Sequence, residues 1–294
     1  MLITYGSASE TLARSVAREG SFGIVESLKR SFPDGEQYVR ILGDLSGKDI
    51  VLIQSLAFNP DPLLVEYLLL ADAIRSARCR SLTAVIPYLA YLRQDNRFNP
   101  GEPLSAKVIA SVIESPKIDR LVTVDAHLHR FRSLSDLFSV PSLNLSAMPL
   151  LADYYLKNFG NLDTVVVGPD MESEQWAKVV AAHLSSPYII LEKRRLGDRE
   201  VSVKGEVSVK GKVAVLVDDI VSTGTTLVNV TSRLLEEGAE RVDAMITHAL
   251  LLEDAYQKLK AAGLDHLIST DTVPNPHSKV SVAPLISKVL KSLQ

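Results

Sequence analysis

The sequence predicts an α/β fold of two tandem domains, each with a mostly parallel sheet flanked by helices. Short apolar runs alternate along the chain with longer segments of helical periodicity, which is typical of βαβ units. This series occurs twice, and a stretch rich in Ser and Pro, residues 139–149, separates the two copies. We therefore expect one domain over residues 1–143 and a second over residues 144–294.

The elements of the first half follow from its apolar runs. Strands are predicted at 2–5, 49–55, 82–88 and 120–127, and helices at 8–19, 61–78 and 104–114.

The second half repeats this rhythm. Strands are predicted at 164–170, 187–193, 213–219 and 241–248, and helices at 146–158, 172–184, 225–237 and 281–292. The near-duplicate VSVKGEVSVKGK, residues 201–212, predicts a β-hairpin that turns at Gly205-Glu206. The C-terminal helix has an alternative placement, packed back on the first domain, which would make the boundary approximate.

Composition excludes several classes of protein. Lys plus Arg is 32 and Asp plus Glu is 35, so the net charge of 32 − 35 = −3 gives no basic footprint for nucleic acid. The single cysteine, Cys79, permits neither an intrachain disulfide nor a cysteine-based zinc site. We see no signal peptide and no apolar run long enough to span a membrane, and therefore expect a cytoplasmic protein without a membrane partner.

The stretch VAVLVDDIVSTGTTL, residues 213–227, carries the strongest chemical signal. Hydroxyls, one glycine and a helix N-terminus together suit a phosphate. Asp218 and Asp219 would repel that phosphate, but they can accept hydrogen bonds from sugar hydroxyls or face a metal. A sugar phosphate satisfies both halves. The alternative is a solvated acidic turn in which Thr225 or Thr226 caps the helix.

Acids and cations follow other strands too, in VDAHLHR (124–130), VGPDMES (167–173) and EKRRL (192–196). Ligands of open α/β sheets bind beyond the carboxyl ends of the strands, so these segments favour phosphate-transfer chemistry. The chain contains neither a G-x-x-x-x-G-K-[ST] nor a G-x-G-x-x-G motif, so any nucleotide binds without these loops.

VLVDDIVSTGTT resembles the phosphoribosyl-diphosphate motif shared by type I phosphoribosyltransferases and ribose-phosphate diphosphokinases. FPDGEQYVR (32–40) and PYLAYLRQDNRF (87–98) resemble the ATP-binding segments of the diphosphokinases. VDAHLHR, VGPDMES and EKRRL resemble their metal-binding, second-domain and flexible-loop segments. Because the six segments occur in the family's order, the chain is identified as a member of that family, which implies two phosphoribosyltransferase-like domains.

The resemblance also implies roles for individual residues. The residues implied to bind ATP are Phe32, Asp34, Gly35, Glu36, Arg93, Gln94 and Asp95. The implied Mg²⁺ ligands are His127 and Asp170, with Asp125 as an additional candidate and His129 as a weaker one. The implied catalytic residues are Lys193 and Arg195. The residues implied to bind ribose 5-phosphate are Arg195, Asp218, Asp219, Ser222, Thr223, Gly224, Thr225 and Thr226.

Some of these residues also have a purely structural interpretation. By composition alone, residues 34–36 are a surface turn and residues 93–95 a charge cluster at a helix end. Met171, Glu172 and Ser173 depart from the small residues of many relatives, which leaves open how the ligand next to Asp170 is held.

The implied reaction transfers the β,γ-diphosphoryl group of ATP to the 1-hydroxyl of ribose 5-phosphate, and yields 5-phosphoribosyl 1-diphosphate and AMP. The resemblance further implies a homo-oligomer, for which we expect a dimeric unit. Two alternatives are a phosphoribosyltransferase that consumes the activated sugar and a non-catalytic regulatory paralogue.

Overall fold

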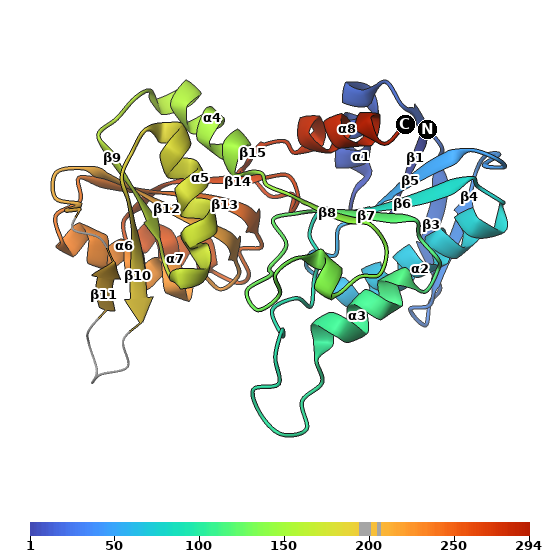
Figure 1. Ribbon diagram of the computed structural model, residues 1–294, viewed down its shortest axis with the longest axis horizontal. Helices are drawn as coiled ribbons and strands as arrows, with labels where there is room; N and C mark the ends of the chain where they lie inside the picture. Colours follow the sequence, from blue (N-terminus) through green and yellow to red (C-terminus); the bar gives the residue numbers. More distant parts are fainter. Residues whose placement is uncertain (194–200, 205–206) are drawn as a thin grey trace. The chain divides into compact units, whose positions relative to one another are not determined.

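The computed structural model describes residues 1–193, 201–204 and 207–294. The chain forms two compact units (Figure 1), of which the first comprises Met1–Leu145 with Ser281–Gln294 and the second Ser146–Val280. The described part contains no helix that is long and apolar enough to span a membrane.

The first unit is built on a parallel sheet with the strand order β2-β1-β5-β6-β7-β8. Its central strands are continuous apolar runs that are buried, as expected for parallel strands covered by helices on both faces. The strands are β1 (Leu2–Tyr5), β2 (Gly23–Ile24), β5 (Asp49–Ile53), β6 (Ser81–Ile86), β7 (Arg120–Val124) and β8 (Ser142–Leu145), and the helices are α1 (Glu10–Gly20), α2 (Pro60–Ser76), α3 (Ser105–Glu114) and the 3-10 turn η1 (Leu134–Asp136).

An antiparallel hairpin, β3 (Ser27–Ser31) with β4 (Gln37–Ile41), forms a separate two-stranded sheet in this unit. The sequence analysis did not predict these strands. Their residues are largely exposed or only partly buried, so they lack the apolar run by which a buried strand is identified.

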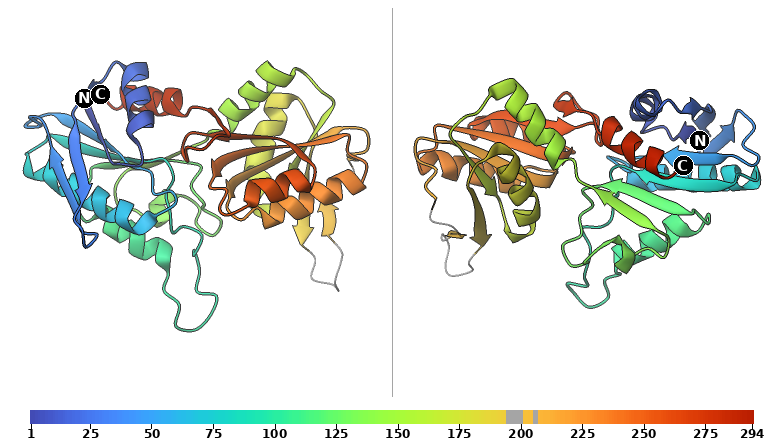
Figure 2. Two further views of the ribbon diagram at one scale, coloured as in Figure 1. Left: turned by 180° about the vertical axis from the view of Figure 1, so that it is seen from behind. Right: turned by 45° about the horizontal axis from the view of Figure 1, so that its top comes forward.

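The last helix, α8 (Ala283–Ser292), belongs to the first unit and packs on α1 (Figure 2). Ile286 and Leu290 are fully buried, and the ammonium of Lys291 donates to the carbonyl of Glu19 at 3.1 Å. The assignment of residues 144–294 as a whole to the second domain differs from this division, because the apolar face of α8 is buried in the first unit.

The second unit contains the sheet β11-β10-β9-β12-β13-β14-β15, in which β11 is antiparallel to β10 and the other pairs are parallel. The strands are β9 (Thr164–Gly168), β10 (Tyr188–Lys193), β11 (Val201–Lys204), β12 (Val213–Val221), β13 (Arg241–Ala249), β14 (Leu264–Thr270) and β15 (Ser278–Val280). The helices are α4 (Met148–Phe159), the 3-10 turn η2 (Met171–Ser173), α5 (Glu174–Leu184), α6 (Thr225–Glu236) and α7 (Ala255–Ala261). Residues of α4 and α5 build the core on one face of the sheet, and residues of α6 and α7 build it on the other.

The two units share one arrangement of parallel strands. In chain order within each unit, β1, β2, β5, β6, β7 and β8 correspond to β9, β10, β12, β13, β14 and β15. In each unit, the helix that follows the first strand packs on a second helix. In the first unit α1 packs on α8, and in the second unit α5 packs on α4. The predicted fold class, two tandem domains with mostly parallel sheets, is confirmed.

One predicted feature is wrong. The hairpin within residues 201–212 does not form, because β11 pairs with β10 and residues 207–212 form no strand. The stretch at 139–149 contains the boundary between the units, which falls after Leu145, and Ser142–Leu145 within it also form the edge strand β8, paired with β7.

Candidate active site

The predicted phosphate loop joins β12 to α6 in the second unit. Gly224 is the N-cap of α6 with φ of 75°, a left-handed conformation that glycine adopts without steric cost. The alternative that Thr225 or Thr226 caps the helix is therefore wrong, since both are its first residues. The side chains of Thr223, Thr225 and Thr226 are exposed, and the N–H groups of a first helical turn have no partner within the helix. Hydroxyls and N–H groups thus face solvent together, as phosphate binding requires.

The loop is held from behind. The carbonyl of Ser222 accepts a hydrogen bond from the N–H of Leu252 at 3.0 Å, and that of Gly224 accepts one from Val228 at 2.8 Å. These bonds fix the loop to the segment after β13 and to α6, so its exposed face is supported by ordered backbone.

Asp218 and Asp219 lie within β12 rather than after it, because pairing with β13 continues to Val221. Asp219 is 2% exposed, and its N–H donates to Asp218 Oδ1 at 3.0 Å. Burial raises the pKa of Asp218 well above its ordinary value, and the carboxylates of Asp219 and Asp170 raise it further. A cluster of carboxylates that repel one another suits a divalent cation, whose preferred ligands are oxygens.

Asp170 follows β9 and caps the 3-10 turn of the divergent residues Met171–Ser173. Its Oδ1 accepts from the N–H of Ser173 at 3.0 Å, and the hydroxyl of Ser173 donates back to the Asp170 carbonyl at 2.6 Å. A Cβ at Gly168 would lie 2.4 Å from Ser173 Oγ, so the turn needs that glycine. The departure in sequence therefore forms a cap that orients Asp170.

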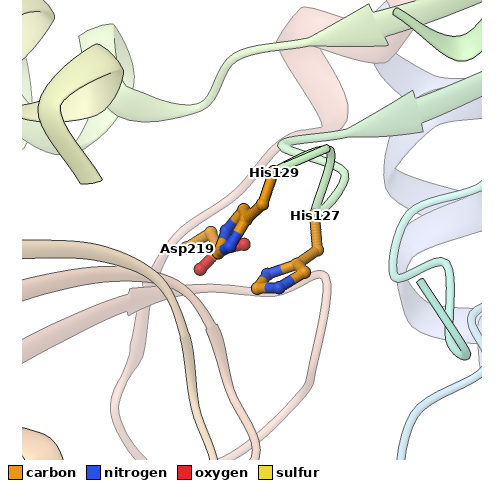
Figure 3. A group of neighbouring side chains, drawn as sticks. All are labelled: His127, His129 and Asp219. Atoms are coloured by element: carbon orange, nitrogen blue, oxygen red, sulfur yellow. The ribbon is translucent and has the colours of Figure 1, made fainter. Parts of the chain in front are cut away.

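In the first unit, Asp125, His127 and His129 follow β7. The imidazoles of His127 and His129 lie side by side with ring centroids 3.4 Å apart (Figure 3), as their spacing by two predicts. The backbone is anchored to β8, because Asp125 N donates to the Leu145 carbonyl at 2.7 Å. Asp125 itself is 2% exposed, which makes it less accessible to a metal than the histidines. Asp219, also labelled in Figure 3, comes from β12 of the second unit.

Residues 93–95 contact the same histidine segment through an ion pair between Asp95 and Arg130, which the sequence analysis did not predict. Asp95 is 6% exposed, and its Oδ1 accepts from Arg130 Nη1 at 2.9 Å. Gln94 accepts from the hydroxyl of Ser105 at the start of α3, while Arg93 is exposed. Of the three predicted residues, Asp95 is therefore the one that holds Arg130 of the histidine segment, and its predicted role in ATP binding stays a prediction.

Residues 32–36 form the tip of the β3–β4 hairpin. Phe32 N donates to the Glu36 carbonyl at 2.7 Å, and Gly35 N donates to the Phe32 carbonyl at 2.9 Å. Gly35 has φ of 96°, which explains the glycine. The Phe32 ring is 40% exposed and lies under the guanidinium of Arg30, 5.2 Å from the ring centroid. The segment is a surface turn, and one that presents an aromatic face.

The two predicted catalytic cations fall at the edge of the described chain. Lys193 ends β10, where its backbone pairs with Val201 of β11. Arg195 lies outside the described residues. The structure thus brings together two sets of predicted residues. In the first unit, Asp95 is joined to the segment at 125–130 through Arg130, and in the second, Asp170 lies near Asp218 and Asp219. Residues 32–36 belong to the first unit, and Lys193 and residues 222–226 belong to the second.

Two protein-family models match the chain. The model described as the N-terminal domain of ribose phosphate pyrophosphokinase matches residues 1–116. The phosphoribosyl transferase domain model matches residues 134–282.

Curated relatives match over nearly the full length. The ribose-phosphate pyrophosphokinase of Methanopyrus kandleri is 39% identical over 294 residues, covering 100% of this chain and 99% of the relative. That of Methanothermobacter thermautotrophicus is 37% identical over 286 residues, covering 97% and 98%. Among solved structures, phosphoribosylpyrophosphate synthetase from Mycobacterium smegmatis superimposes with a TM-score of 0.90 at 30% identity, covering 99% of this chain and 98% of that one.

Proposed function

The chain belongs to the ribose-phosphate pyrophosphokinase family and is an enzyme of that class, and we propose that it makes 5-phosphoribosyl 1-diphosphate and AMP from ATP and ribose 5-phosphate. The family matches confirm the resemblance that six segments predicted. The reaction places the enzyme among the transferases of nucleotide biosynthesis.

The observation that carries the proposal is the strand, loop and helix at residues 213–226. The loop at 222–226 presents exposed threonines at the N-terminus of α6, and would hold the 5-phosphate. Asp218 and Asp219 would accept hydrogen bonds from the ribose hydroxyls. In this arrangement the 1-hydroxyl remains free to attack the β-phosphorus of ATP, and the bond from that phosphorus to the oxygen of AMP breaks.

The first unit supplies candidates for the nucleotide. The exposed ring of Phe32 would pack on adenine, with Asp34 and Glu36 accepting its amino hydrogens. Arg93 is exposed, and its guanidinium suits the nucleotide phosphates, with Gln94 nearby.

Mg²⁺ is the cofactor we propose, held by His127 and Asp170, with Asp125 as an additional ligand. Oxygen donors and mutually repelling carboxylates fit such an ion. When bound, it would neutralise charge on the phosphate oxygens.

Lys193 and Arg195 would stabilise the transferring diphosphoryl group, because preplaced cations favour the charge that builds up in the transition state. We further propose a cytoplasmic enzyme that assembles from dimeric units. The exposed Leu28 and Leu42 of the first unit support self-association, which light scattering measures.

The decisive experiment measures AMP release from ATP and Mg²⁺ with and without ribose 5-phosphate. Release should require the sugar phosphate, and ribose without its phosphate should not replace it. Consumption of 5-phosphoribosyl 1-diphosphate with a nucleobase, and no AMP from ATP, would indicate a phosphoribosyltransferase instead. No turnover in either assay would indicate the non-catalytic paralogue.

A further inference from the structure

The first unit contains a counterpart of the ligand-binding edge of the second unit. Because the strand orders agree, β1 corresponds to β9 and β5 to β12. The loop from β1 to α1, residues 6–9, therefore corresponds to the loop that carries Asp170. The segment after β5, residues 54–59, corresponds to the candidate phosphate loop.

The segment after β5, residues 54–59, lacks the features of a phosphate loop. It ends at α2, whose first residues are Pro60 and Asp61, so the first turn carries a proline without an N–H and an acid that repels phosphate.

A buried carboxylate occupies the neighbouring loop. Glu66, nearly two turns inside α2, is 4% exposed, and its Oε1 accepts from the N–H of Ser7 at 2.5 Å. The same oxygen accepts from Gln54 Nε2 at 3.1 Å. A short bond from a backbone N–H to a carboxylate, at a loop that leads into a helix, is the contact by which such loops hold anions.

Gln54 also contacts the loop at residues 6–9. It is fully buried, and its Oε1 accepts from the N–H of Ala8 at 3.3 Å. A Cβ on Gly6 would lie 2.2 Å from that Oε1, so the side chain lies directly against the glycine. The hydroxyl of Ser9 accepts from Ser55 N at 2.7 Å, which joins the loop to the segment after β5.

A cation balances the buried charge. The ammonium of Lys29 lies 3.1 Å from the carbonyl of Tyr5, the residue before Gly6. Burial lowers the pKa of Lys29, and the Glu66 carboxylate opposes this shift. An anion with a nearby cation at a loop of N–H groups is the arrangement expected of a bound ligand.

We propose that Glu66 is a built-in anion that occupies the ligand loop of the first unit, closing it to external anions. The loop keeps its capacity to bind a carboxylate, so removal of the side chain creates a site for a small monocarboxylate such as acetate or formate.

Chemical rescue of Glu66→Ala in the full-length chain tests this. Thermal unfolding is followed by calorimetry in about 0.2 M sodium acetate and in sodium chloride of the same concentration. Acetate should raise the melting temperature of Glu66→Ala by about 3 °C more than that of the wild type. Equal shifts in the two proteins overturn the proposal.

Two variants serve as controls. Glu66→Gln fills the same space and can still accept from Ser7, so acetate should stabilise it no more than the wild type. Glu114→Ala removes another carboxylate that accepts backbone N–H groups, from Ser139 at 2.7 Å and Val140 at 2.9 Å. Glu114 is only half-buried and Ser139 is exposed, so this variant should show no specific response to acetate, because solvent already reaches the site. A response of either control equal to that of Glu66→Ala also overturns the proposal.

If Glu66→Ala does not fold in chloride, refolding yield replaces melting temperature. Native protein should then be recovered in acetate and formate but not in chloride, and failure in all three salts overturns the proposal. The readout is folding, so it is independent of whether the second unit carries out the proposed reaction.

Discussion

Gly224→Ala is the sharpest test of the phosphate loop, because the structure fixes what the new methyl group can do. Its Cβ would lie 3.5 Å from Ala255 Cβ and 3.6 Å from Leu259 Cγ, which is ordinary contact and no clash. The cost is therefore the left-handed backbone at φ of 75°, about 1–2 kcal/mol for a residue other than glycine.

That strain can appear in two measurements. If the free loop relaxes in the variant, binding must restore the strained conformation, and the ribose 5-phosphate dissociation constant rises by about 5- to 30-fold. We expect this outcome, because Thr223 and the first residues of α6 are exposed, so no side-chain packing there holds the variant in the strained conformation. Calorimetric titration of ribose 5-phosphate measures the affinity, and urea unfolding measures the stability.

Gly211→Ala is the matched control. Gly211 has φ of 72°, and a Cβ there meets nothing within 4 Å, but it lies outside the candidate site. This variant should lose about 1–2 kcal/mol of stability at most and bind ribose 5-phosphate normally. Unchanged affinity in Gly224→Ala without a loss of stability that accounts for the strain, or equal loss of affinity in both variants, would refute the assignment of the loop to the 5-phosphate.

Three further predictions concern catalysis, ligand division and the fold. Lys193→Ala should lower turnover by about 100- to 1,000-fold with small changes in ATP and ribose 5-phosphate binding, and turnover within about threefold of wild type in the AMP-release assay contradicts the role. Asp218→Asn with Asp219→Asn should weaken ribose 5-phosphate far more than ATP, and equal losses in calorimetric titrations of the two ligands count against the proposed division. Leu290→Ala, at a fully buried position of α8, should lower the free energy of unfolding by about 2–5 kcal/mol. Lys288→Ala, exposed on the same helix, should change it by less than about 0.5 kcal/mol, and similar urea midpoints for the two variants contradict this packing.

Most buried central strands were predictable because most of their residues are apolar. The predicted strand at 2–5 matches β1 to the residue, and the predicted strand at 213–219 falls on β12, although the strand continues to Val221. That extension depends on pairing with β13, which no local pattern reveals. Edge strands such as β8 and the exposed hairpin β3–β4 were missed for the opposite reason, since partly solvated strands carry mixed residues.

In the candidate site, too, some features were predictable from the sequence and others were not. The segments after the strands were predictable, because polar groups that follow apolar runs collect at one edge of a parallel sheet. The pairing of Asp95 with Arg130 was not, because the two residues are far apart in sequence and only tertiary folding joins them. The cap formed by Asp170 and Ser173 had a local signal in its spacing of three, which is the spacing of a capping box.

The shared strand order also places α8 in the fold. In the second unit, α4 precedes β9 and packs on α5, so every element of that unit is contiguous in residues 146–280. In the first unit the helix that packs on α1 is α8, which follows the whole second unit in the sequence. Ile286 and Leu290 are fully buried there, so α8 is core rather than tail. The first unit therefore needs a contact of very high sequence separation to complete its core, whereas the second unit does not. Since distant contacts form late, we expect the second unit to complete its core before the first.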